Sequence, residues 1–159
     1  MNAAYKHLRE LLTTFRLKLD APTLYLALKA TVDEFDKMRA DIDVILDYGL
    51  GHCPLSANED IHVLQIIREA MTNAIKHSHA DRIELKCVHT DNHKTIFSVI
   101  DNGVGISDNP YKDHHYGLST MKERAALVDG ELSITSDNGK SSNNKGTTVS
   151  LAFIPAAFS

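Results

Sequence analysis

Glu69, Asn73 and Lys76 stand at helical spacing in the segment 58–77, and a carboxylate, an amide and an ammonium group together suit a metal–phosphate complex. Asn73 follows Glu69 by four residues and Lys76 follows Asn73 by three, so all three share one side of a helix. The amide oxygen can ligate Mg²⁺, the ammonium can meet phosphate charge, and the carboxylate can orient or deprotonate a nucleophile. The alternative is a solvated polar face, which this helix alone would favour. Asparagine is, however, a poor helix former, so its place in an apolar helix needs a reason.

The helix that carries these residues is predicted from its apolar spacing. Residues three and four apart form a broad buried face, at Ile61, Leu64, Ile67, Met71 and Ile75. Ser56 and Glu59 stand three residues apart at its start and form a capping-box pattern. The sequence therefore predicts a long amphipathic helix over 58–77 that presents the three polar residues together.

A second candidate motif, Asp101-Asn102-Gly103-Val104-Gly105, follows an apolar run over 95–100 that is typical of a buried central strand. Gly103 and Gly105 allow the backbone to approach a ligand closely. An aspartate at the end of a buried strand needs a partner, and the exocyclic amine of a base would serve. The alternative is an ordinary turn, because D-N-G is strong turn chemistry. The motif is neither a Walker A loop nor a Rossmann fingerprint.

Two further glycines precede predicted elements. Gly117-Leu118 opens a predicted helix over 118–128, where free backbone N–H groups could hold phosphate, although a plain N-cap glycine fits as well. Gly146-Thr147 begins the last predicted strand, and a turn glycine followed by β-branched residues is the simpler interpretation.

Composition places the chain among ordinary globular proteins. With 159 residues, 43% of them hydrophobic, it can form one domain with a real core. The net charge of −4 implies no attraction to nucleic acid or to a membrane surface. No segment resembles a membrane helix or a signal peptide. Cys53 and Cys87 lie far apart, which favours a reduced cytoplasmic setting over a disulfide scaffold.

The first 40 residues predict two helices. Segment 5–19 carries apolar residues spaced 3, 4, 3 and 4, a coiled-coil seam too short to stand alone. It is interpreted as the end of a longer helix whose partners are missing, or as an edge helix of the domain. Asp20-Ala21-Pro22 ends it, and Pro22 suits the first turn of a new helix that runs to about Arg39.

The remaining chain predicts a sheet interrupted by helices. Strands are expected at 42–46, 82–88, 95–100, 131–136 and 147–153, the last two forming a hairpin. This order lacks strict β-α-β alternation. It favours an α/β (α+β) two-layer sandwich, in which helices cover one face of a mixed, mostly antiparallel sheet.

Together the four motifs resemble those of the gyrase, Hsp90, histidine kinase and MutL (GHKL) ATPase superfamily. Glu69-x-x-x-Asn73-x-x-Lys76-His77 resembles its N box, and Asp101-x-Gly103-x-Gly105 its G1 box. Gly117-Leu118 resembles the G2 box, and Gly146-Thr147 the final G-T element. Segments 68–77 and 117–124 resemble one subgroup of sensor histidine kinases. The run over 11–17 resembles the part before the catalytic domain in nitrate/nitrite sensors of the NarX/NarQ type.

The resemblance implies a Bergerat-type fold that binds ATP and Mg²⁺. By it, Asn73 would ligate Mg²⁺, and Glu69 would polarise the nucleophile or a water near the γ-phosphate. Lys76 and the helix start at Gly117 and Leu118 would hold phosphates.

The adenine side of the site is implied in the same way. Asp101 would bind the adenine amine with Thr147 near it through water, and His77 would sit beside the nucleotide. Gly103 and Gly105 would belong to the loop around it. The short lid between Gly105 and Gly117 departs from the family pattern and implies a more open pocket.

The resemblance also implies partners outside this chain. None of the nine histidines is followed by Asp or Glu, so the phosphoacceptor histidine is expected on an absent helical hairpin, with a response regulator downstream. Residues 1–20 would end the dimerisation helix and residues 21–156 would form the catalytic domain. This domain would be cytoplasmic in a homodimeric kinase of the bacterial inner membrane, with the fragment itself monomeric.

Three functions remain open. The first is phosphoryl transfer from ATP to that histidine, in nitrate/nitrite signalling. The second is a GHKL-type ATPase with Glu69 as general base on water. The third is a non-enzymatic nucleotide-binding module that signals through its N-terminal helix.

Overall fold

A computed structural model describes residues 3–105, 117–138 and 145–159. Its elements follow one another in the order α1 (Ala3–Asp20), α2 (Leu24–Asp36), β1 (Asp43–Tyr48), α3 (Ala57–His77), β2 (Arg82–His89), β3 (Thr95–Asp101), α4 (Leu118–Ala126), β4 (Glu131–Asn138), β5 (Lys145–Phe153) and the short 3₁₀ helix η3 (Ala156–Phe158).

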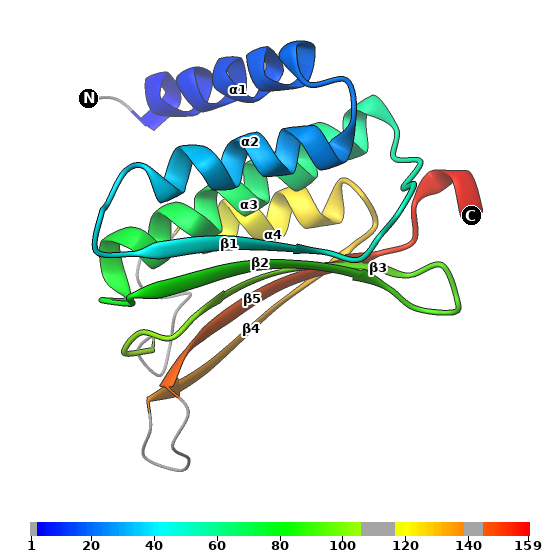
Figure 1. Ribbon diagram of the computed structural model, residues 1–159. Helices are drawn as coiled ribbons and strands as arrows, with labels where there is room; N and C mark the ends of the chain where they lie inside the picture. Colours follow the sequence, from blue (N-terminus) through cyan, green and yellow to red (C-terminus); the bar gives the residue numbers. More distant parts are fainter. Residues whose placement is uncertain (1–2, 106–116, 139–144) are drawn as a thin grey trace.

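The strands form one five-stranded sheet in the order β1-β2-β3-β5-β4. β1 and β2 run parallel, and every other neighbouring pair is antiparallel. The helices all lie on one face of this sheet, with α1 on the outside of the helical layer (Figure 1). The predicted fold, a mixed and mostly antiparallel sheet covered on one face, is confirmed.

Helix α3 forms the middle of the helical layer, and its start is fixed by Glu59. The Glu59 side chain accepts from the backbone N–H of Ser56 at 2.9 Å, and the Ser56 hydroxyl accepts from Glu59 N–H at 3.1 Å. This confirms the predicted capping box. The second carboxylate oxygen of Glu59 accepts from Ala156 N–H at 3.0 Å. One buried side chain therefore caps α3 and ties the C-terminal segment to it.

We expect Glu59→Ala to lower the free energy of unfolding by about 2 kcal/mol, because it removes half of a capping box and a backbone tether. Urea denaturation would measure the loss. Asp33→Ala is the control, since the Lys29–Asp33 pair is exposed and should contribute less than about 0.5 kcal/mol. Equal losses for the two variants would show that the tether carries no stability.

The predicted start of the second helix at Pro22 is wrong. Thr23 is the N-cap, and its side chain accepts from the backbone N–H of Leu26 at 3.2 Å, so the helix begins at Leu24. A hydroxyl in extended backbone satisfies a free N–H of the first turn, which proline cannot do. The helix also ends at Asp36, before the predicted Arg39. The Asp36 carboxylate instead accepts from Val44 N–H of β1 at 2.9 Å.

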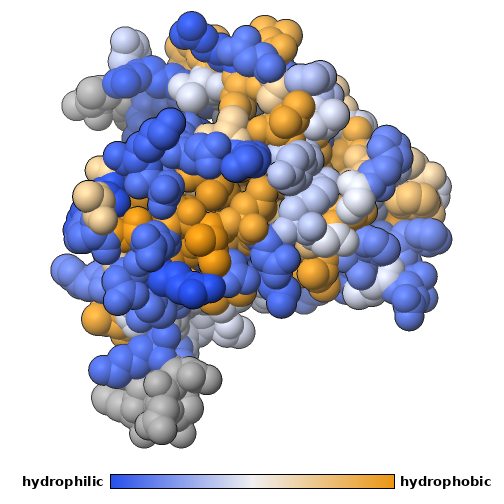
Figure 2. All heavy atoms as spheres, viewed as in Figure 1, coloured by the Kyte–Doolittle hydropathy of each residue, from blue (hydrophilic) through white to orange (hydrophobic). Residues whose placement is uncertain are grey.

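The predicted apolar seam of α1 faces solvent. Its side chains are 45–84% exposed, at Tyr5, Leu8, Leu12, Phe15 and Leu19. Apolar atoms are accordingly visible at the surface over α1 in Figure 2. Among the residues that the structure describes, no helix has both the length and the apolar character needed to span a bilayer.

Side chains alternate between the two faces of the sheet along β3, and this alternation places Asp101 on the face that the helices cover. Phe97, Val99 and Asp101 are all buried on the helix-facing side, whereas Ile100 between them points to the open side. On the next strand, Thr147 pairs with Asp101 and is likewise buried. The end of β3 thus delivers a carboxylate into the layer between sheet and helices.

Candidate functional site

A small cavity of about 30 Å³ lies between α3, α4 and the ends of β3 and β5. Six of the ten predicted site residues line it: Asn73, His77, Asp101, Gly105, Leu118 and Thr147. Ala70, Ala74, Ser78 and Val149 complete its wall. The structure therefore brings together residues from all four motifs.

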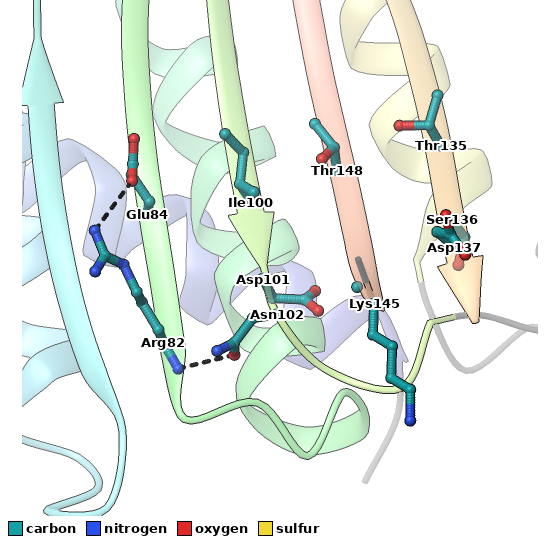
Figure 3. Close-up of a pocket in the computed structure, with 11 residues that line it drawn as sticks. Arg82, Glu84, Ile100, Asp101, Asn102, Thr135, Ser136, Asp137, Lys145 and Thr148 are labelled. Carbon is teal, nitrogen blue, oxygen red and sulfur yellow. Dashed lines mark hydrogen bonds and ion pairs between the residues drawn. The ribbon is translucent and has the colours of Figure 1, made fainter. Parts of the chain in front are cut away.

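Asp101 is held in this cavity by backbone donors. Its Oδ1 atom accepts from Gly103 N–H at 2.9 Å and from Thr147 N–H at 3.2 Å, so Oδ2 takes no part in these two bonds. Burial raises the pKa of Asp101 above its ordinary value, and the two N–H donors oppose that rise. Figure 3 shows Asp101 at the end of its strand with the carboxylate directed toward β5. The group is a fixed, buried acceptor.

Gly103 allows the loop after β3 to lie against the C-terminal end of α3. A Cβ atom at this position would come within 2.1 Å of the Ser78 carbonyl oxygen and 2.6 Å of Ser78 Cβ. Val104 N–H donates to that same carbonyl at 2.7 Å. Gly105 follows with a φ of +82°, a conformation that favours glycine. Gly103 thus serves the close packing of the loop against α3, whereas a Cβ at Gly105 would meet Ser136 Oγ of β4 at 2.7 Å.

Asn102 fixes the loop from its other side. Its side-chain oxygen accepts from the N–H groups of Asp81 at 3.2 Å and Arg82 at 3.1 Å, and its Nδ2 donates to the Asp81 carboxylate at 2.6 Å. Figure 3 shows Asn102 turned toward the start of β2. The local sequence indicates only a turn at Asn102, because the partners of its side chain lie some twenty residues earlier in the chain.

Glu69 and Gly117 lie next to each other, outside the cavity that contains Asp101. Gly117 is the N-cap of α4 with a φ of +60°, and a Cβ there would lie 2.3 Å from Glu69 Oε1. The carboxylate therefore rests against a helix N-terminus, where the helix dipole favours negative charge. Burial raises the pKa of Glu69, the charge of Glu10 adds to the rise, and Lys6, Lys76 and His7 oppose it.

Four predicted residues do not line the small cavity. Glu69 and Gly117 line a separate cleft beside α1, Gly103 supports the loop, and Lys76 is exposed. The short lid predicted between Gly105 and Gly117 falls on 106–116, outside the described residues.

A larger hollow of about 890 Å³ lies on the open face of the sheet (Figure 3). Its floor consists of outward-facing strand residues such as Glu84, Ile100 and Thr148. An ion pair of 3.6 Å between Arg82 and Glu84 crosses one side. Apart from Asp101, Asn102 and Gly146, it contains none of the residues of the four motifs, so the smaller cavity is the candidate site.

Curated relatives match the chain almost from end to end. It is 40% identical to the nitrate/nitrite sensor protein NarQ of Escherichia coli K12 over 96% of its own length and 26% of the relative. It is 38% identical to the sensor NarX of the same organism, covering 98% of this chain and 25% of the relative. The chain therefore spans about a quarter of the length of these relatives.

Solved structures share the fold at low sequence identity. A blue-light activated histidine kinase of Erythrobacter litoralis superposes with a TM-score of 0.80 at 16% identity, over 96% of this chain and 50% of that one. The ATP-binding domain of PrrB from Mycobacterium tuberculosis gives a TM-score of 0.64 at 20% identity, over 79% of this chain and 88% of that one.

A family model supplies the remaining comparison. Residues 58–157, from the first turn of α3 to the C-terminal segment, match the family described as histidine kinase-, DNA gyrase B- and HSP90-like ATPase. That match contains the capped α3, the buried Asp101, the Gly117 helix start and the paired Thr147. The chain therefore belongs to this ATPase family.

Proposed function

We propose that this chain binds Mg·ATP at the candidate site and transfers the γ-phosphoryl group to a histidine on a helix outside the chain, for relay to a response regulator. The observation that carries the proposal is the fixed, buried carboxylate of Asp101, with Asn73 and His77 of α3 lining the same cavity. The names of the relatives, nitrate/nitrite sensor proteins, favour a role in nitrate/nitrite signalling.

The adenine end of the site is assigned to Asp101 and Thr147. Oδ2 of Asp101 would accept from the adenine amine, since Oδ1 already serves two backbone donors. Thr147 lines the same cavity as Asp101, so a water could connect it to the base. His77 would lie beside the nucleotide, and Gly103 and Gly105 would keep the loop close to it.

The phosphate end is assigned to α3 and to the start of α4. Mg²⁺ is commonly held by one or two protein oxygens together with substrate phosphates, and the Asn73 amide can provide one of them. Lys76 and the free N–H groups after Gly117, at Leu118 and beyond, would meet phosphate charge. Glu69, resting against that same helix start, would polarise the attacking group.

The remainder of the kinase would lie beyond this chain. Residues 1–20 would end a dimerisation helix, because the apolar seam of α1 is exposed and suits another helix. Residues 21–156 would form the catalytic domain, placed in the cytoplasm by a parent protein of the bacterial inner membrane. The parent would be a homodimer whose helical hairpin carries the phosphoacceptor, and the fragment would be monomeric.

We expect Asn73→Ala to abolish the increase in affinity that Mg²⁺ gives to a non-hydrolysable ATP analogue, because the ion loses its protein ligand. Calorimetric titration with and without Mg²⁺ would measure this. Asn58→Ala, an exposed position on the same helix, is the control and should behave as the wild type. An unchanged effect of Mg²⁺ in Asn73→Ala would refute the assignment of the metal.

A further inference from the structure

The side chain of Asp101 forms a turn with the loop that follows it. Its Oδ1 atom accepts from the N–H of Gly103, two residues later, which is an Asx turn. The second donor to that atom, Thr147 N–H, lies on β5, where Thr147 pairs with Asp101 in the sheet. Gly103 has no such support, because β3 ends at Asp101. The position of the carboxylate therefore depends on the contacts that hold the loop.

Asn102, the middle residue of this turn, anchors the loop to the start of β2. Its side-chain oxygen accepts from the N–H groups of Asp81 and Arg82, and its Nδ2 donates to the Asp81 carboxylate. Its backbone N–H donates to the Arg82 carbonyl at 3.3 Å. These bonds lie just beyond Ile83 and Asp101, the last pair of residues between β2 and β3. One exposed residue thus extends the hold of the sheet into the loop.

The three side-chain bonds require an acceptor and a donor on one short group. The asparagine amide provides both. A carboxylate at this position could accept from the two backbone N–H groups, but it would face the Asp81 carboxylate with like charge. The loop also contains Gly103 and Gly105, and glycine has the most conformational freedom to lose. Without the anchor, the turn that holds Asp101 should therefore loosen.

The Asn102 side chain acts from outside the candidate site. It belongs to the hollow on the open face of the sheet, where Figure 3 shows it turned toward Arg82. Neither Asn102 nor Asp81 lines the cavity that contains Asp101. An effect of either residue on a ligand in that cavity must therefore pass through the turn at Asp101.

We propose that Asn102 and Asp81 position the Asp101 carboxylate and thereby set how strongly the site prefers a base that carries an exocyclic amine. The inference rests on the proposed function, which assigns Oδ2 of Asp101 to the adenine amine. Asn102 and Asp81 are positioning residues. Their loss leaves the lining of the cavity in place and removes the fixed direction of the carboxylate.

Calorimetric titration of the whole chain with two non-hydrolysable triphosphate analogues tests this proposal. One analogue carries adenine, and the other carries unsubstituted purine, which lacks the amine. In Asn102→Ala, the affinity for the adenine analogue should fall about tenfold, as for one lost hydrogen bond, and that for the purine analogue should change by less than about twofold. Asn92→Ala, an exposed asparagine in the turn between β2 and β3, is the matched control and should keep the wild-type preference.

Equal losses for the two analogues would overturn the proposal, since the anchor would then support the pocket as a whole. An unchanged affinity for the adenine analogue would overturn it as well.

An exchange of the two side chains tests the contact with Asp81. In Asn102→Asp two carboxylates face each other, so the preference for adenine should fall about tenfold. Adding Asp81→Asn places an amide donor opposite the new carboxylate and should restore the preference to within about threefold of the wild type. A double variant no better than Asn102→Asp alone would overturn the role of Asp81.

Amide hydrogen exchange without nucleotide separates this inference from the proposed function. In Asn102→Ala, the Gly103 amide should exchange about tenfold faster than in the wild type, whereas the Val99 amide in the middle of β3 should be unchanged. An unchanged rate at Gly103, or an equal increase at Val99, would overturn the inference whatever the chain binds. A wild type that binds the two analogues equally, or binds neither, would reject the adenine assignment of Asp101 and leave the exchange result intact.

Discussion

Asp101→Asn should lower the affinity for an ATP analogue by about 100-fold while leaving the fold intact. The asparagine oxygen can still accept from Gly103 and Thr147, which both use Oδ1 of the native side chain. Its Nδ2 would replace Oδ2, so a donor would face the donor amine of adenine. A lost hydrogen bond to a charged group together with an unpaired donor amounts to about 3 kcal/mol.

The same variant should be at least as stable as the wild type at pH 7. Burial raises the pKa of Asp101 in the folded protein, so the stability that its protonated form provides is lost as the pH rises through that pKa. Asparagine has no charge to bury. The advantage of the variant should therefore grow with rising pH and vanish well below about pH 4, the ordinary aspartate range.

Calorimetric titration and urea denaturation at several pH values would measure the two effects. Asp47→Asn is the control, because this aspartate is exposed on β1 and should change neither quantity. A variant that binds the analogue as the wild type does would remove Asp101 from the adenine pocket. A variant that unfolds would show that the carboxylate is part of the scaffold.

Local patterns in the sequence predict the elements that carry the site. The capping box at Ser56 and Glu59 locates α3 to within one residue, because both partners lie within one helical turn. The continuous apolar run over 95–100 predicts a central strand, and alternation then sets the direction of Asp101. These features depend on near neighbours in the chain, so local sequence patterns predict them.

Contacts between distant segments could not be predicted. Asn102 bonds to Asp81 and Arg82, and Lys18 pairs with Asp60, yet no local spacing indicates either partnership. The placement of Glu69 and Asn73 in different cavities is a second example. Helical spacing puts them on one side of α3, yet Glu69 lines the cleft with Gly117, and Asn73 lines the cavity with Leu118.

Gly103→Ala should lower the free energy of unfolding by about 3 kcal/mol or more. The added Cβ would meet the carbonyl oxygen of Ser78 at 2.1 Å and its carbonyl carbon at 2.7 Å, and backbone atoms cannot move aside as a side chain can. Gly51→Ala is the matched control, since its φ of +59° is unfavourable for alanine but no atom lies within 4 Å. That variant should lose only about 1–2 kcal/mol.

Urea denaturation of the two glycine variants, together with analogue binding, would separate the steric cost from the conformational one. Equal losses would mean that the loop moves away from Ser78 at little cost. The close contact at Gly103 also positions the Gly103 N–H group, which donates a hydrogen bond to the Asp101 carboxylate. Stability and nucleotide binding should therefore fall together in Gly103→Ala. Asp101→Asn should lower binding alone. This contrast follows from one feature of the site: the backbone positions the carboxylate, and the carboxylate binds the ligand.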